Sequence, residues 1–386
     1  MLWFLVAILS CASAAQFVVQ LRDGLTMNSV LNYNSLDAFQ EDQRVTDTFE
    51  LGPFKAFTGD FCGATLQKLY NDANVLGISR DRNLRLQEMV LQQSAPSHLV
   101  GLSSLSPLSH RPFIYNSDGG NGVDVYLLDT GIDVKHPNLS KLNILRMADL
   151  TASPVPQGSD PQGHGTAMAG IIASETFGVI KKCNLVDVRV ADSRGAVRLS
   201  TILQALTLTQ RHIEGTKRPS VVVLPLEMED GNNPILTQAI ASFDKSVAII
   251  VAAGNNALDA HAFSPANVNP KPENVIVVGA LNRNNGLAKF TNYGSNVDIF
   301  TAGEQVTTLR STELDSQESS DSLTRQVSGT SASSAITAGV IGYYMSLGFN
   351  STQSVDRVLQ YSQCANTLVG HSSSANQCAK VLQLQP

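Results

Sequence analysis

Short apolar runs alternate with amphipathic segments along most of the chain beyond Gly122. The apolar runs predict strands over residues 123–128, 184–190, 220–226, 248–252, 275–278 and 297–300. Apolar positions at helical spacing predict helices over residues 165–174, 199–212, 235–245, 331–347 and 352–361. Because strands and helices alternate, we expect an α/β fold whose mainly parallel sheet has helices on both faces.

One predicted helix, residues 331–347, is nearly uncharged and apolar on all sides, which is typical of a helix inside a domain. Ser331 lies at its start, after Gly329 and Thr330. A helix N-terminus offers unpaired N–H groups and positive potential where an anion can form. Small residues at a helix start also serve packing, so a chemical role for Ser331 depends on a histidine and an aspartate in matching settings.

The N-terminal part of the chain has a different pattern. Residues 17–21, 57–61 and 75–79 predict strands and residues 64–70 a helix, which together make a small α+β module. A stretch rich in Ser, Pro and Gly begins at Gln92 and predicts a domain boundary at its beginning. We therefore expect one folded part over residues 16–89 and a second over residues 90–386.

Residues 1–15 form a short apolar run that ends in small residues, Ala12-Ser13-Ala14. This pattern is typical of a secretory signal peptide, although no basic residue precedes the run. A buried N-terminal strand is the alternative. The run is too short to span a membrane, and no other segment is long and apolar enough. We predict no membrane span and a secreted protein, extracellular or in a cell wall, with the vacuole as another destination.

The composition, 43% hydrophobic and 16% charged residues, indicates a globular protein with a substantial core. The net charge of −6 argues against a nucleic-acid partner, which would need clustered Lys and Arg. We expect a monomer. Cys364 and Cys378 lie close together near the C-terminus and predict a disulfide in an oxidising compartment, which leaves Cys183 unpaired and buried.

Three polar residues occupy positions where an open α/β sheet places its ligand, at strand ends or helix starts. Asp129 follows the apolar run 123–128, and Asn255 follows a strand that ends in Ala-Ala-Gly. His164 lies between two glycines before a helix of small residues. Each alone has an ordinary interpretation as a turn or surface residue.

Together with Ser331, these residues form a set suited to acyl transfer. Ser331 would attack a carbonyl, His164 would accept its proton, and Asp129 would hold the imidazole. The side-chain amide of Asn255 is a neutral donor for the developing oxyanion.

The order of these residues and the sequence around them resemble the subtilisin-like serine peptidases, most closely the proteinase K branch, over about residues 94–359. The matching segments are Asp129-Thr130-Gly131-Ile132, Gly163-His164-Gly165-Thr166, Ala252-Ala253-Gly254-Asn255 and Ser328-Gly329-Thr330-Ser331. The resemblance implies a serine endopeptidase of peptide or protein substrates that needs no cofactor for catalysis. It also implies that residues 16–89 are an inhibitory propeptide, cut away around residues 86–94; a permanent N-terminal domain is the alternative.

The resemblance also implies two substrate-binding edges and shows where this chain departs from the family. One edge contains Gly195 and Val197, where a glycine is usual at the second position. The other contains Pro225, Leu226 and Glu227, in a segment where the family usually has Ser-Leu-Gly-Gly and where a substrate strand pairs with the edge. Residues 252–254, which are Ala252, Ala253 and Gly254, complete the predicted substrate site.

Two milder departures lie beside the catalytic positions. Ala167 stands where the family usually has a second histidine, and residues 332–335 lack the usual proline. Neither removes a catalytic atom.

Two interpretations of the altered cleft follow. The first is a selective peptidase with a narrowed, acid-lined pocket that favours small or basic residues before the cleaved bond. The second is a catalytically impaired, secreted or cell-wall binding protein on the same fold. An esterase is a third hypothesis, although no Gly-x-Ser-x-Gly segment surrounds Ser331.

Family members often bind structural calcium. Asp298 matches a ligand position, with the carbonyl of Val275 as a partner. One carboxylate with carbonyls would make a weak calcium site. A solvated aspartate is the alternative.

Overall fold

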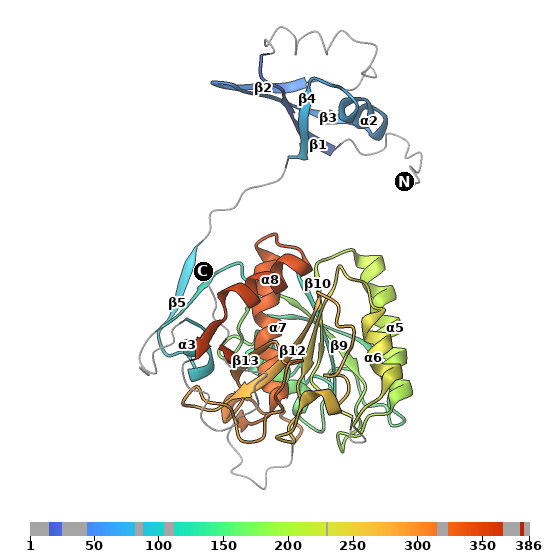
Figure 1. The fold of residues 1–386 in the computed structure, drawn as a ribbon, viewed down its shortest axis with the longest axis vertical. Coiled ribbons are helices and arrows are strands. Elements are labelled where there is room, and N and C mark those ends of the chain that lie inside the picture. Colours follow the sequence, from blue (N-terminus) through green and yellow to red (C-terminus); the bar gives the residue numbers. More distant parts are fainter. Residues whose placement is uncertain are drawn as a thin grey trace. The chain divides into compact units, whose positions relative to one another are not determined.

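The computed structural model describes residues 15–24, 45–81, 88–103, 112–228, 231–314, 323–365 and 379–381, without the side chains of residues 15, 363–365 and 379–381. The chain divides into two compact units, Met1–Leu86 and Gln87–Pro386 (Figure 1). The predicted signal peptide lies outside the described residues except for Ala15, which begins the first strand.

The first unit is an antiparallel sheet with one helix. Its strands, in the order β2-β3-β1-β4, are β1 (Ala15–Leu21), β2 (Val45–Leu51), β3 (Phe54–Phe61) and β4 (Val75–Arg80). Helix α2 (Gly63–Tyr70) contributes Leu69 to a core that contains Val19, Phe57 and Phe61. Strand β2 was not predicted, because it is a mostly exposed edge strand of largely polar sequence.

The second unit contains a nine-stranded sheet in the order β16-β17-β13-β12-β11-β10-β7-β9-β8. Its strands are β7 (Asp124–Asp129), β8 (Asn143–Asp149), β9 (Asn184–Arg189), β10 (Ser220–Leu224), β11 (Ala248–Ala252), β12 (Val275–Leu281), β13 (Ile299–Ala302), β16 (Gln363–Ala365) and β17 (Ala379–Val381). All neighbouring strands are parallel except β16 and β17. The predicted mainly parallel sheet is confirmed.

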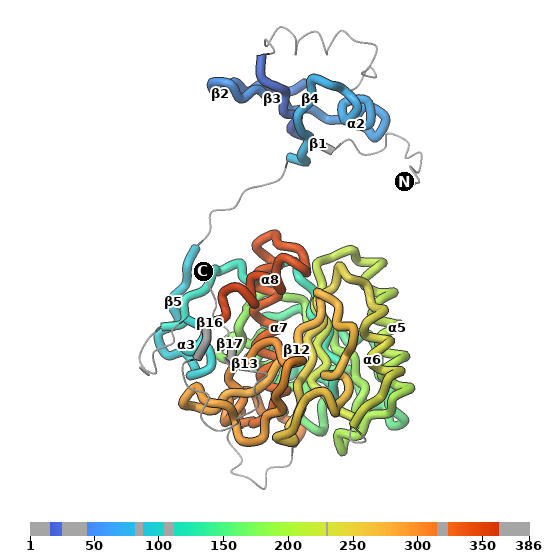
Figure 2. The backbone as a smooth tube through the Cα atoms, viewed as in Figure 1, coloured from blue at the N-terminus to red at the C-terminus, as the bar shows by residue number. Residues whose placement is uncertain are grey.

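Helices cover both faces of this sheet, as predicted (Figures 1 and 2). Alternate residues of β7 enter two different cores, since Val125 and Leu127 face one and Tyr126 and Leu128 the other. The first core includes α4 (His164–Ala173), α7 (Thr330–Ser346) and α8 (Ser351–Tyr361), and the second includes α5 (Leu199–Thr216) and α6 (Pro234–Ala241).

The remaining elements are short. They are β5 (Met89–Gln92), α3 (Ser97–Ser103), β6 (Phe113–Asn116), η1 (Pro137–Leu139), η2 (Ala260–Ala262), β14 (Val306–Leu309) and β15 (Thr324–Val327). Among the described residues, no helix has the length and apolar character needed to cross a membrane.

Some predicted boundaries were wrong for local reasons. Strand β10 ends at Leu224 rather than at residue 226, because Pro225 has no N–H to continue the ladder. Helix α6 ends at Ala241 rather than at residue 245. Ser242 caps the helix, and its backbone N–H donates to the Gln238 carbonyl. Cys183 is buried with a free thiol, as predicted. The predicted Cys364–Cys378 disulfide lies outside the residues whose side chains the structure describes.

Candidate active site

Asp129 and His164, far apart in the sequence, meet at the carboxyl end of the sheet. Asp129 is the last residue of β7 and is 4% exposed. The Nδ1 atom of His164, the first residue of α4, lies 2.8 Å and 2.9 Å from the two carboxylate oxygens of Asp129. Because an ionised carboxylate only accepts hydrogen bonds, this contact assigns the proton to Nδ1 and leaves Nε2 as the basic atom.

A close backbone approach makes this contact possible. A Cβ atom at Gly165 would overlap the carbonyl oxygen of Gly131, so the first turn of α4 can lie against the loop after β7 only with glycine there. Gly131 has a φ of +119°, a conformation that favours glycine. The two glycines therefore set the separation of Asp129 and His164.

The surroundings of His164 favour its protonated form. Burial lowers the pKa of the imidazole, but the Asp129 carboxylate, through its charge and hydrogen bond, and the more distant Asp160 raise it, while Arg325 opposes them. The net effect is a pKa above the ordinary value. The side chain remains 35% exposed, so water and a substrate can reach it.

Ser331 lies at the start of α7, and 15 of the 17 residues of this helix are buried. Ser331 and Ser346 are the two that are not. The helix is thus an internal one, as predicted, and it presents Ser331 at its accessible end. The Ser331 hydroxyl donates to the carbonyl oxygen of Pro225, 2.9 Å away, and among the described residues it makes no hydrogen bond to His164.

Asn255 is tied to the residue before Ser331. Its Oδ1 atom accepts hydrogen bonds from the Thr330 backbone N–H at 2.8 Å and from the Thr330 hydroxyl at 3.1 Å. Since Oδ1 is occupied, the amide NH₂ group is the part of this exposed side chain that can donate to a ligand.

A pocket of about 410 Å³ opens beside Asp129 and His164. Apolar side chains such as Ile202 and Met228 form part of its wall. Of the predicted substrate-binding residues, those that line it are Gly195, Val197, Pro225, Leu226 and Glu227. Ala252, at the end of β11, and the adjacent Ala253 and Gly254 are buried and lie outside the lining of this pocket.

Glu227 lines the pocket and is also bound to a neighbouring loop. Its Oε2 atom accepts the backbone N–H of Asn255 at 3.0 Å. Burial raises the pKa of the Glu227 carboxyl, while hydrogen bonds from Asn255 and the Asn256 side chain oppose this rise. The carboxyl group thus connects the predicted substrate-binding edge to the loop that carries Asn255.

The predicted calcium ligands do not fit a calcium ion. The Asp298 carboxylate accepts the Lys271 ammonium on one oxygen and the Val277 backbone N–H, at 2.8 Å, on the other. Lys271 also donates to the Asn296 carbonyl, so its ammonium lies where a cation would be expected. Val275 lies in β12, and no group of three or more His, Cys, Asp or Glu side chains within the described ranges could hold a metal.

Arg189, which was not predicted from the sequence, binds the backbone of Thr130, the residue after Asp129. This side chain is 1% exposed, donates to the carbonyl of Thr130 at 2.8 Å and pairs with Asp149 at 2.9 Å. Its position in the apolar strand β9 is the signal that could have revealed it, because a buried arginine needs partners.

The fold and this geometry define a class, the α/β proteins with a carboxylate–imidazole pair at the carboxyl end of a mainly parallel sheet. The Subtilase family matches residues 120–378. Subtilisin-like proteinase Mp1 of Magnaporthiopsis poae is 31% identical over 358 residues, covering 89% of this chain and 85% of the relative. Proteinase R of Parengyodontium album is 31% identical over 337 residues, covering 87% of this chain and 80% of the relative.

A solved structure agrees. The crystal structure of a cold adapted subtilisin-like serine proteinase has a TM-score of 0.65 and 26% identity, and the match covers 76% of this chain and 99% of that one. The chain belongs to the subtilase family and is a subtilisin-like serine endopeptidase.

We predict that Gly165→Ala lowers the free energy of unfolding by more than about 3 kcal/mol or prevents folding, because the new methyl group meets backbone that cannot rotate away. Gly215→Ala in α5 is the matched control. No atom lies within 4 Å of its added Cβ, so it should stabilise the protein by about 0.5–1 kcal/mol. Thermal melting of the purified variants tests this, and a wild-type melting temperature for Gly165→Ala would contradict it.

Proposed function

We propose that this endopeptidase cleaves peptide bonds through Ser331 as nucleophile, His164 as general base and Asp129 as the group that orients the imidazole. The contact of His164 Nδ1 with both carboxylate oxygens of Asp129 is the observation that carries this proposal. It leaves Nε2 free to accept the serine proton, and Asp129 stabilises the imidazolium cation that results.

The proposed reaction starts when the Ser331 hydroxyl leaves the Pro225 carbonyl and turns to His164. As the serine oxygen bonds to the substrate carbonyl carbon, its proton passes to Nε2. Collapse of the tetrahedral intermediate breaks the C–N bond, and the leaving amine takes that proton. Water then attacks the acyl-enzyme by the reverse sequence and restores Ser331, so the steps need no cofactor.

The oxyanion of the intermediate would form at the N-terminus of α7. The helix dipole favours negative charge there. The Ser331 backbone N–H is the first donor that we propose, because the Thr330 N–H donates to Asn255 and the Ala332 N–H to the Gly329 carbonyl. The NH₂ group of Asn255 is the second donor that we propose, because Thr330 already occupies the Oδ1 atom.

We predict that Ser331→Ala lowers the rate of peptide hydrolysis by at least about 1,000-fold, because it removes the nucleophilic oxygen. Rates on a peptide library and on matched peptide esters, for wild type and variant, provide the measurement. Equal peptidase rates for the two proteins would refute the proposal. Ester cleavage without peptide cleavage would favour an esterase instead.

The altered cleft favours a selective peptidase over an impaired binding protein in our proposal. Glu227 and His164 line the same pocket, where the Glu227 carboxyl can attract a basic residue before the cleaved bond. It is only partly buried and accepts a neutral backbone N–H, so this contact leaves its negative charge available to a substrate.

We predict that Glu227→Gln lowers kcat/KM for substrates with Lys or Arg before the cleaved bond by about 10-fold, while substrates with Ala there change little. Glutamine can still accept the Asn255 N–H, so it removes the charge and keeps the contact. A library profile before and after the change is the measurement. An unaltered basic preference in Glu227→Gln would show that this carboxyl does not select the substrate.

We also propose that the protein is made as a secreted, self-inhibited precursor in which the first unit is the propeptide. The propeptide must end before Gln92, because Gln92 is the last residue of strand β5, and β5 pairs with β6 within the second unit. The Gln92 side chain donates to the Thr176 carbonyl at 2.8 Å and accepts from Lys181 at 3.2 Å. The mature chain should therefore keep Gln92.

We predict that the mature N-terminus lies between residues 86 and 92 and that Ser331→Ala stays unprocessed, because the protein cuts itself. N-terminal sequencing of both purified proteins tests this. A wild-type start after Gln92 would contradict the proposed boundary, and normal processing of Ser331→Ala would assign the cut to another protease.

A further inference from the structure

A second buried carboxylate, that of Asp160, lies in the loop before α4, four residues before His164. It is 0% exposed, and among the described residues no Lys, Arg or His forms an ion pair with it. Four hydrogen bonds reach its oxygens instead. They come from the Thr130 hydroxyl at 2.8 Å, the Gly163 N–H at 2.8 Å, the Thr166 N–H at 2.8 Å and the Thr166 hydroxyl at 2.6 Å.

These four contacts indicate that the Asp160 carboxylate is ionised, because all four groups donate to it. The Thr130 hydroxyl oxygen accepts the Gly165 N–H at 2.9 Å, and the Thr166 hydroxyl oxygen accepts the Asp133 N–H at 3.0 Å. Each hydroxyl proton is thereby directed at Asp160, which receives only donors. Burial raises the pKa of the Asp160 carboxyl, and the hydrogen bonds oppose that rise.

The same contacts connect both members of the Asp129–His164 pair. Thr130 follows Asp129 in the chain, and its backbone N–H donates to Asp129 Oδ1 at 2.7 Å. Gly163 precedes His164, and Thr166 completes the first turn of α4. Asp160 thus accepts hydrogen bonds from residues adjacent to both members of the pair.

We propose that Asp160 is a positioning residue of this peptidase, one that aligns Asp129 and His164 and whose negative charge stabilises the protonated histidine during the reaction. The inference rests on the proposed roles of Asp129, His164 and Ser331, and it assigns a further residue to that site.

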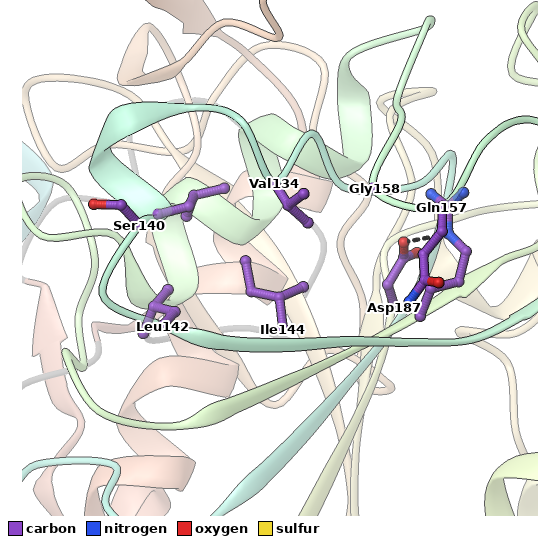
Figure 3. A pocket seen from close by; sticks show the side chains of 9 residues that line it. Val134, Ser140, Leu142, Ile144, Gln157, Gly158 and Asp187 are labelled. Atoms are coloured by element: carbon purple, nitrogen blue, oxygen red, sulfur yellow. Dashed lines mark hydrogen bonds and ion pairs between the residues drawn. The ribbon is translucent and has the colours of Figure 1, made fainter.

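Hydrogen bonds from Arg146 fix the loop that carries Asp160. Arg146 donates to the carbonyls of Pro156 and Ser159 at 2.9 Å and 2.7 Å and pairs with the buried Asp187 at 2.7 Å. Figure 3 shows this side of the loop, where Gln157 and Gly158 line a pocket of about 400 Å³ together with Val134, Ile144 and Asp187. Burial raises the pKa of Asp187 to about 7 despite Arg146, and the nearby charge of Asp160 adds to this rise.

Three charged groups act on the imidazole of His164, namely Asp129 and Asp160, which raise its pKa, and Arg325 on β15, which lowers it. Without the Asp160 charge the pKa of His164 falls. Hydrolysis needs the neutral imidazole, so activity rises with pH through this pKa. Loss of the charge should therefore move the acidic limb of the pH profile to lower pH.

The test compares kcat, KM and pH profiles of wild type and Asp160→Asn on a fluorogenic peptide amide that the wild type cleaves. We expect kcat to fall about 10- to 100-fold with KM little changed, because the pair loses alignment. We expect the acidic limb of kcat/KM to move down by a few tenths of a unit to one unit. An acidic limb at the wild-type pH with unaltered kcat would overturn the proposal.

Asp133→Asn is the matched control. Asp133 is also 0% exposed, and its carboxylate also accepts four hydrogen bonds, from Lys135, Ser311 and both donors of Thr312. It is not among the groups that act most strongly on the pKa of His164. We expect a loss of thermal stability similar to that of Asp160→Asn and no movement of the acidic limb; the same movement in both variants would overturn the inference.

Asp160→Asn places an amide among four donors and can fail to fold. Thr130→Val then decides, because it breaks the link to Thr130 while keeping the Asp160 charge. We expect a lower kcat with the acidic limb unmoved, and recovery of kcat in Thr130→Ser, which restores the hydroxyl. Wild-type kcat in Thr130→Val would overturn the positioning role. An inactive wild type, or an active Ser331→Ala, would instead refute the proposed function itself.

Discussion

The first turn of α4 passes so close to the loop after β7 that position 165 has no room for a side chain beside the Gly131 carbonyl. This approach brings His164 within hydrogen-bond distance of both oxygens of Asp129. It also exposes the backbone N–H groups of a helix start to neighbouring side chains, and Thr130 and Asp160 satisfy them. Backbone packing, rather than side-chain choice alone, thus determines the geometry of the site.

Ser331 is positioned by the internal helix α7, in whose first turn it is the single accessible residue. Burial of α7 on all sides fixes where Ser331 can lie, and the Ser331 hydroxyl donates to the Pro225 carbonyl. Pro225 and Glu227 belong to the edge against which a substrate would pair. Because Pro225 binds the Ser331 hydroxyl and Glu227 binds the Asn255 loop, we propose that substrate binding at this edge is coupled to the orientation of the proposed nucleophile and oxyanion donor.

The sequence predicted the parallel sheet well, because strands buried on both faces, such as β10 and β11, are continuous apolar runs. Edge strands escaped prediction, since polar residues interrupt the apolar pattern of β2 and β8. The positions of Asp129, His164, Asn255 and Ser331 at strand ends and helix starts could also be predicted. Contacts between distant segments could not, because no local pattern reveals that Lys271 pairs with Asp298 or that Glu227 turns to Asn255.

We propose above all that Ser331 is a nucleophile activated by His164. Labelling of the native protein with a fluorophosphonate, followed by mass spectrometry of its peptides, tests this most directly. We predict one phosphonylated residue, Ser331, with labelling abolished by prior heat denaturation and strongly reduced in His164→Ala. Absence of labelling in the folded, processed protein, or a label on another serine, would contradict the claim.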